Sequence, residues 1–163
     1  GLDPAVRGVI RQVLDEGRLL EDHEFDIAAA LLRRFLADAQ ASRGDWLLLN
    51  GLPRHAGQAR EIDRLHPIRA VLQLTAPREV LHERIARDTG GDRAGRTDDD
   101  RARITARIAR YEARSAPLVE HYERRGAACL EVEIGVHTGA LDTARRVASG
   151  LREAGLDTSS GAR

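Results

Sequence analysis

Apolar residues recur every three to four positions in several stretches of this chain, the spacing expected when one face of an α-helix packs against a core. The spacing predicts helices over residues 4–16, 22–39, 56–65, 78–87, 98–116 and 139–151. The first of these begins with Pro4 and stops at Gly17, which suits proline in a first helical turn and glycine just past a last one. In the second, the expected inner face consists of Phe25, Ile27, Ala28, Leu31, Leu32 and Phe35.

Short apolar stretches lie between these helices. The unbroken run at residues 46–49 is typical of a strand buried on both faces of a parallel sheet, a second apolar run at 70–74 predicts another strand, and a further strand is expected at 129–134. Strands that alternate with helices favour an α/β fold, a sheet flanked by helices. Ligands in such folds bind at the carboxyl ends of the strands, which points to residues 50–54 and to the loop after Leu74.

Composition and charge argue against several classes of function. The 163 residues carry 26 basic and 26 acidic side chains, so the formal net charge is zero and no one-signed field attracts a nucleic acid or a membrane surface. We expect no nucleic-acid partner, no membrane association and a cytoplasmic protein. Every basic residue is arginine, so any phosphate is held by planar guanidinium groups rather than by lysine. The single Cys129 excludes an internal disulfide and a cysteine metal cluster.

A first group of candidate residues follows the apolar run at 46–49, where a buried strand is expected to turn into a helix. Gly51 allows a ligand to approach the backbone, Arg54 can hold an anion with two hydrogen bonds, and Gln58 can read a base edge with its amide. The alternative is a tight turn with a surface arginine, and the residues alone favour neither.

A second group lies around Arg96 and Arg107. Eleven residues separate the two, which returns a helix to nearly the same direction and suggests a phosphate clamp. The alternative is a solvated charged face, because arginines recur three or four residues apart at Arg103, Arg107, Arg110 and Arg114. By themselves, Arg84 and Arg87 also read as surface ion pairs. The histidines show no metal-site spacing, and only His55 adjoins a candidate site.

Together, these groups resemble the motifs of the adenylate kinase family. The first resembles Asp-Gly-Phe-Pro-Arg-x-x-x-Gln-Ala and reads Asn50-Gly51-Leu52-Pro53-Arg54-x-x-x-Gln58-Ala59. The second resembles Arg-x-Asp-Asp with a later Arg-x-x-x-Tyr and comprises Arg96, Asp98, Asp99, Arg107 and Tyr111. Residues 83–85 are similar to the helix that leads into the family's lid, and residues 15–20 to its Gly-Lys-Leu-Val segment. The resemblance covers residues 6–147.

The resemblance implies a P-loop NTPase-like three-layer α/β/α fold with a parallel sheet. Residues 1–153 would form a kinase core, with an acceptor-side helical segment at about 17–40, a short lid at about 88–97 and a disordered tail at 154–163. The implied activity is the reversible transfer of a phosphoryl group from Mg²⁺-bound ATP to AMP or another nucleoside monophosphate, with no zinc. We expect a monomer.

Residue roles follow from the same resemblance. Arg54 would hold the acceptor phosphate, with Leu20, Gly51 and Gln58 around the base. Arg84, Arg96 and Arg107 would align the transferred phosphoryl group, and Arg87, Asp98 and Asp99 would serve the lid and its phosphate contacts. The lid would exclude water from the reaction.

Three departures from the family pattern weaken the expectation. The chain contains no Gly-x-x-x-x-Gly-Lys-[Ser/Thr] loop to hold the donor phosphates, and with the absence of methionine this favours truncation over evolutionary loss. Asn50 stands where the family has an aspartate that orients the water shell of Mg²⁺, and Asp88 stands where it has a lid arginine. We therefore expect the 163 residues alone to be inactive. The rivals are a non-catalytic nucleotide-binding protein of the same fold and an interaction module whose arginines only solvate helix faces.

Overall fold

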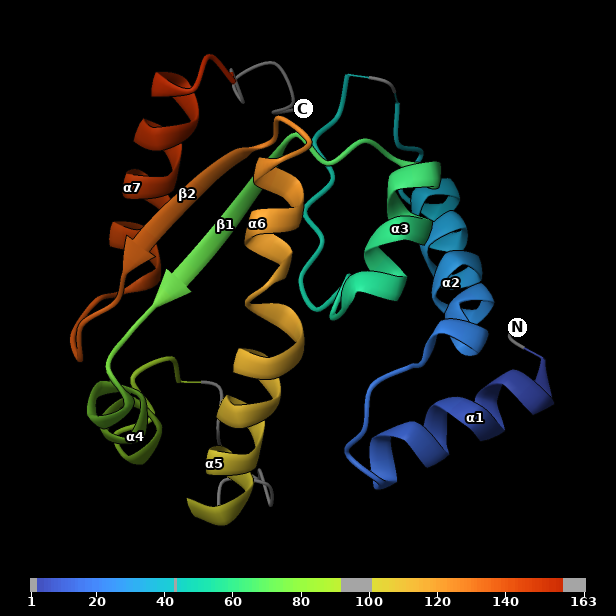
Figure 1. Ribbon diagram of the computed structural model, residues 1–163, viewed down its shortest axis with the longest axis horizontal. Helices are drawn as coiled ribbons and strands as arrows, with labels where there is room; N and C mark the ends of the chain where they lie inside the picture. Colours follow the sequence, from blue (N-terminus) through green and yellow to red (C-terminus); the bar gives the residue numbers. More distant parts are fainter. Residues whose placement is uncertain (1–2, 43, 92–100, 157–163) are drawn as a thin grey trace.

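The computed structural model describes residues 3–42, 44–91 and 101–156. Two strands separate groups of helices along the chain (Figure 1). In order, the elements are α1 (Pro4–Asp15), η1 (Asp22–Glu24), α2 (Phe25–Asp38), α3 (Ala56–Leu65), β1 (Ala70–Thr75), α4 (Arg78–Ala86), α5 (Arg101–Arg110), η2 (Tyr111–Ser115), α6 (Leu118–Glu123), β2 (Ala128–Glu133) and α7 (Ala140–Glu153). The expected α/β class is confirmed.

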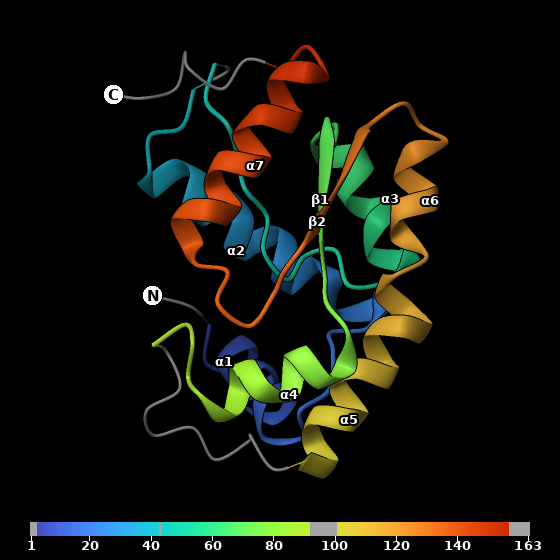
Figure 2. The same ribbon diagram turned by 90° about the vertical axis from the view of Figure 1, so that its left-hand side faces the viewer.

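Two parallel strands form the sheet in the described part of the chain. β1 pairs with β2 in a register that sets Ala70 opposite Ala128 and Thr75 opposite Glu133. Helix α7 covers one face of this sheet and α6 covers the other, as the two perpendicular views show (Figures 1 and 2). The arrangement is a three-layer α/β/α core, in which both strands end on the same side as α4.

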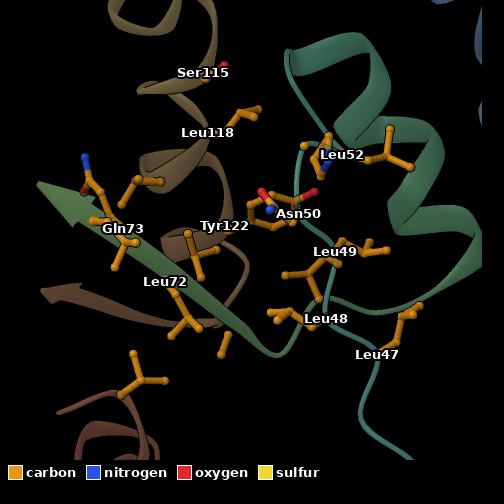
Figure 3. A pocket seen from close by; sticks show the side chains of 18 of the residues that line it. Leu47, Leu48, Leu49, Asn50, Leu52, Leu72, Gln73, Ser115, Leu118 and Tyr122 are labelled. Carbon is orange, nitrogen blue, oxygen red and sulfur yellow. The ribbon is translucent and has the colours of Figure 1, made fainter. Parts of the chain in front are cut away.

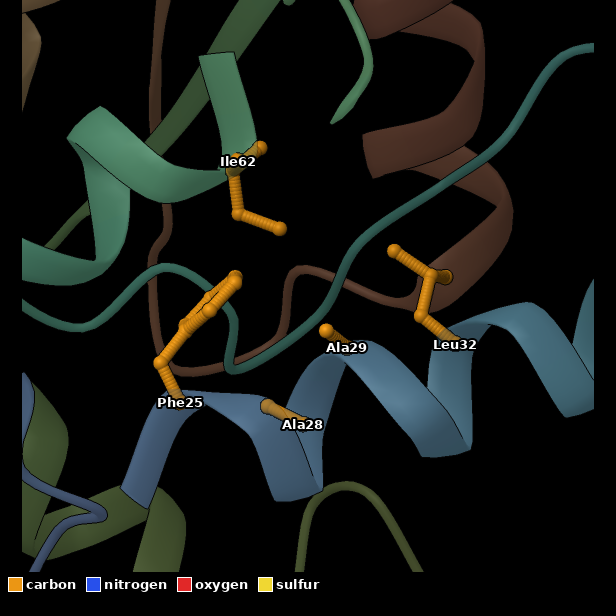
Figure 4. Close-up of a cluster of buried hydrophobic side chains, with 5 residues drawn as sticks. All are labelled: Phe25, Ala28, Ala29, Leu32 and Ile62. Carbon is orange, nitrogen blue, oxygen red and sulfur yellow. The ribbon is translucent and has the colours of Figure 1, made fainter. Parts of the chain in front are cut away.

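A second packing unit joins α2 to α3. Phe25, Ala28, Ala29 and Leu32 of α2 are buried against Ile62, which is completely inaccessible to solvent (Figure 4). These positions follow the i, i+3, i+4, i+7 spacing of a helix face. Leu31 and Phe35 belong to the expected inner face but are exposed. The covered face of α2 is narrower than expected and includes Ala29 in their place.

The strand predicted at residues 46–49 is wrong. Leu47 and Leu49 pack against the α2–α3 cluster while Leu48 between them is 78% exposed, so the side chains alternate as in an extended strand. However, in the described part of the chain β1 has β2 as its only strand neighbour, and no strand is paired with residues 46–49. An extended segment becomes a β-strand only when an adjacent backbone supplies hydrogen bonds.

Some expected features lie outside the described residues. These are most of the lid, the start of the helix expected at residue 98, and the tail beyond residue 156. Within the described residues, no helix is long and apolar enough to cross a membrane.

Candidate functional site

The turn from residue 51 to residue 54 carries the arginine of the first candidate group. Gly51 adopts a positive φ of 87°, and the Arg54 side chain folds back so that its Nε donates to the Gly51 carbonyl at 3.0 Å. A Cβ at Gly51 would stand 3.0 Å from Nη2 of Arg54, a tight contact that a small movement of this flexible side chain relieves. The glycine is therefore needed for the backbone angle.

Gln58 connects this turn to the segment around Leu20. Its Nε2 donates to the Leu20 carbonyl at 2.8 Å, and its Oε1 accepts the backbone N–H of Arg54 at 2.7 Å. The side chain is almost fully buried, at 2% exposure. The structure thus brings three predicted site residues into direct contact. Each end of the amide is bonded to protein once, which leaves its second N–H and its second oxygen lone pair for a base.

His55 supports the same carbonyl group. Its Nε2 lies 2.9 Å from the Leu20 carbonyl oxygen, and its Nδ1 lies 3.3 Å from Oδ1 of Asp22. The sequence showed only that His55 adjoins a candidate site, since its partners lie more than thirty residues away in the chain. Asp22 also lies against Gly57, where a Cβ would overlap the carboxylate, so glycine is needed there for close approach.

The Leu20 segment is fixed by its own ion pairs. Arg18 holds Glu24 with both terminal nitrogens, at 2.6 and 2.8 Å, and Glu24 also accepts the backbone N–H of Glu21 at 3.0 Å. The Arg18 guanidinium and that N–H lower the pKa of Glu24 to about 2. Residues 18–24 therefore form a tight turn that presents the Leu20 carbonyl to His55 and Gln58.

Two arginines of the supposed solvated face contact this turn. Arg114 holds the Glu21 carboxylate with two hydrogen bonds of 2.9 Å, and Arg110 donates to the Gly17 carbonyl. Arg114 lowers the pKa of the Glu21 carboxyl by hydrogen bonding to it. The solvated-face alternative is wrong for these two residues. Helical spacing alone could not reveal this, because their partners lie 93 positions away.

A groove of about 970 Å³ begins beside Arg54. Residues 45–54 form one wall and β1 forms the other, with Leu118 and Tyr122 of α6 at its base (Figure 3). Most of the lining is apolar, although Asn50, Gln73 and Ser115 contribute polar atoms. Tyr111 also lines the groove and is 42% exposed, and its hydroxyl accepts a hydrogen bond from the Gln73 amide at 3.2 Å.

The other predicted arginines lie on the helices beyond the sheet. Arg84 of α4 donates from one nitrogen to the carbonyls of Gly135, Val136 and Thr138, which ties α4 to the loop after β2. Arg87 forms an ion pair with Glu83 one helical turn away. Arg107 is a half-buried residue of α5.

Several predicted residues lie outside the described part of the chain, namely Arg96, Asp98 and Asp99. Among the residues that the structure does describe, no group of histidine, cysteine, aspartate or glutamate side chains has the arrangement of a metal site. The described site is a set of arginines, amides and carbonyls joined by hydrogen bonds, and its guanidinium groups are the part suited to an anion.

Comparison with known proteins agrees with this geometry. The family model described as adenylate kinase matches residues 6–127. Adenylate kinases of Xanthomonas euvesicatoria pv. vesicatoria (strain 85-10) and Xylella fastidiosa (strain M12) are each 34% identical over 121 residues, which cover 71% of this chain and 61% of the relative. That of Caulobacter vibrioides (strain NA1000 / CB15N) is 34% identical over 122 residues, 72% of this chain and 60% of the relative.

The matched region thus spans about three-fifths of the length of these relatives. It contains the Gly51 turn, Arg54, Gln58 and the Leu20 segment, the parts that form the hydrogen-bonded site. The chain belongs to the adenylate kinase family.

Proposed function

We propose that this chain provides the acceptor side and much of the core of a nucleoside monophosphate kinase. In the reaction, an oxygen of the AMP phosphate attacks the terminal phosphorus of Mg²⁺-bound ATP, and the bond from that phosphorus to the bridging oxygen breaks, which yields two molecules of ADP. The observation that carries the proposal is the Gly51 turn, in which Arg54 donates through its Nε to the Gly51 carbonyl and through its backbone N–H to Gln58, in a chain of this family.

On the acceptor side, Arg54 would hold the AMP phosphate with two of its donors. The base would lie against the Leu20 carbonyl and Gln58, which bond to each other in the present arrangement. Gln58 would read the base with the amide N–H and the oxygen lone pair that its two protein partners leave unused.

On the donor side, Arg84, Arg96 and Arg107 would align the phosphoryl group and neutralise its charge, which supplies most of the catalysis in phosphoryl transfer. Arg87, Asp98 and Asp99 would serve the short lid that excludes water. Mg²⁺ arrives with the nucleotide as part of the substrate. Asn50 would orient its water shell less strongly than a carboxylate does.

The groove supports a further part of the proposal. Leu48 on one wall and Leu74 of β1 on the other are 78% and 55% exposed, although the faces of parallel sheets are ordinarily covered. We infer that another strand lies between them in the complete protein, followed by the Gly-x-x-x-x-Gly-Lys-[Ser/Thr] loop that the printed sequence does not contain.

The second candidate is a protein of the same fold that binds nucleotides without turnover. Asn50 and Asp88, which replace an aspartate and an arginine of the family pattern, favour it. Restored turnover in Asn50→Asp would show that only the handling of Mg²⁺ is weakened.

The test is the formation of ADP from ATP and AMP by the complete gene product. We expect turnover, and we expect Arg54→Ala to raise the KM for AMP about 10- to 100-fold, which corresponds to the loss of a charged hydrogen-bonding group. Arg64→Ala is the matched control, since Arg64 is an exposed α3 residue paired with Glu61. Absence of activity with any nucleoside monophosphate would sink the proposal, while AMP binding without turnover would favour the second candidate.

A further inference from the structure

A single π-helical turn, η2, joins α5 to α6 and faces both segments that build the acceptor site. It covers Tyr111–Ser115 and is followed by the α6 helix from Leu118. A π-turn widens the helix locally and redirects the side chains that it carries, and such turns occur frequently at functional sites. Here the redirected side chains are those of Arg114 and Ser115.

Three contacts leave this region for the acceptor site. Arg114 holds Glu21 with both terminal nitrogens, Arg110 donates to the Gly17 carbonyl, and the Ser115 hydroxyl donates to the Arg54 carbonyl at 2.8 Å. Their partners are 93, 93 and 61 positions away in the chain. One and a half turns of helix therefore contact the Leu20 segment and the Arg54 turn at the same time.

A change in the position of Glu21 would also move the Leu20 carbonyl. It is the residue that follows Leu20, and it caps η1 through the reciprocal bonds between Glu21 and Glu24. Because Arg18 clamps Glu24, this turn moves as a unit. A displacement of the Glu21 carboxylate would therefore displace the carbonyl that His55 and Gln58 share.

An exposed ion pair is ordinarily worth little, and the chain contains a pair of that kind for comparison. Arg78 binds Glu112 of the same π-turn, but through one nitrogen only, and the two side chains are 57% and 52% exposed. Arg114 and Glu21 are less exposed, at 35% and 42%, and make two parallel hydrogen bonds, the stronger geometry.

We propose that Arg114 is a positioning residue of the acceptor site. Through Glu21 it fixes the Leu20 carbonyl, while its neighbour Ser115 fixes the backbone of Arg54. Monophosphate binding therefore depends on an arginine that holds the Leu20 segment in place. This inference rests on the proposed function, since it concerns the same acceptor site.

Two measurements test it. The first is hydrogen exchange in the 163-residue chain, where Arg114→Gln should accelerate exchange at the backbone N–H of Glu24, which bonds to the Glu21 carbonyl. Arg78→Gln, the matched control, should leave that amide unchanged. The second is the kinetics of the complete gene product, where Arg114→Gln should raise the KM for AMP about 5- to 10-fold, the range of one charge-assisted contact. The KM for ATP should change by no more than about twofold, which is the effect expected from the loss of a surface ion pair that contributes little free energy.

A charge exchange supplies the specific control. The double variant Arg114→Glu with Glu21→Arg restores an ion pair in the reverse sense and should recover part of the loss, whereas Glu21→Gln alone should reproduce Arg114→Gln. Arg114→Lys keeps the charge without the paired donors and should fall in between.

The outcomes separate the two proposals. Equal exchange and equal KM for AMP in Arg114→Gln and Arg78→Gln would overturn the role of Arg114, as would faster exchange with an unchanged KM for AMP. If the gene product has no kinase activity, the proposed function fails, and hydrogen exchange still decides whether Arg114 fixes the Leu20 segment.

Discussion

At the scale of single residues, the proposed acceptor site depends on the glycine at position 51 as well as on the side chains around it. Gly51 has a φ of 87°, and a Cβ there would stand 3.0 Å from Nη2 of Arg54. The same turn leaves the Arg54 backbone N–H free to donate to Gln58. One backbone angle therefore determines both where the guanidinium lies and how the amide is held.

Gly51→Ala should destabilise the protein by about 1–2 kcal/mol, the cost of forcing an L-residue into a left-handed conformation. It should also displace Arg54 and so raise the KM for AMP of the gene product. Gly8→Ala is the control, because Gly8 lies inside α1 with open space around it. That substitution should raise the free energy of unfolding by about 0.5–1 kcal/mol. Urea unfolding measures both, and equal effects would contradict the prediction.

Glu24 predicts how stability depends on pH. Its pKa is about 2 in the folded protein against an ordinary value of 4.5, because Arg18 and the backbone N–H of Glu21 bond to the carboxylate. Between these two pH values the unfolded chain binds a proton that the folded protein does not, so stability is present above pH 4.5 and is lost as the pH falls toward 2.

Glu24→Gln should therefore flatten the loss of stability in acid. It should also lower the free energy of unfolding at neutral pH by about 1.5–3 kcal/mol, the range for hydrogen bonds to charged groups. Urea midpoints measured from pH 6 to pH 3 test both effects. The control is Glu120→Gln, which removes a surface pair with Arg124 that is 70% exposed on the glutamate side. An acid response in Glu24→Gln as steep as in the unaltered chain would refute this account.

At the scale of elements, α2 and α3 contribute to the proposed acceptor side, and Ile62 of α3 packs on the buried stripe of α2. Ala28 and Ala29 are the small members of this cluster, and Phe25 and Leu32 lie at its ends (Figure 4). The position of Gln58 follows from this packing, since Gln58 lies one turn before Ile62 on α3.

Ile62→Ala should lower the free energy of unfolding by about 2–5 kcal/mol, the cost of a cavity in a packed core. Leu65→Ala, three residues along the same helix and 37% exposed, should cost clearly less. Equal losses in urea unfolding would show that the α2–α3 contact is not a main source of stability.

Helices and paired strands could be predicted from the sequence because their periodicity is local. Pro4 opens α1 as expected, and both strands of the sheet overlap the apolar runs that predicted them. The run at residues 46–49 has the same local pattern and is not a strand, since pairing depends on a neighbouring backbone. The exposure of Phe35 could not be predicted from the sequence either, because it depends on how much of α2 the helix α3 covers.

At the scale of the whole molecule, the motif residues predicted the proposed acceptor site but not the residues that hold it in place. Gly51, Arg54 and Gln58 stand close together in the sequence and could be recognised by their spacing. Arg114 and Glu21 lie 93 residues apart, and either one alone resembles a surface charge. Only the fold shows that they meet.

The 163-residue chain should form no ADP from ATP and AMP, because its sequence contains no Gly-x-x-x-x-Gly-Lys-[Ser/Thr] loop to hold the donor phosphates. A coupled assay for ADP tests this, with the complete gene product as the positive control. Turnover by the 163 residues, at a rate that Arg54→Ala abolishes, would contradict the prediction.

In the described part of the chain, β1 pairs with β2 along one edge and with no strand along the other. Beside an apolar wall, such an unpaired edge is a template on which another chain can add a strand. Concentrated samples should therefore associate through this edge, and light scattering should rise with concentration. Leu48→Glu, which places a charge on the exposed wall, should prevent association at concentrations where the unaltered chain associates.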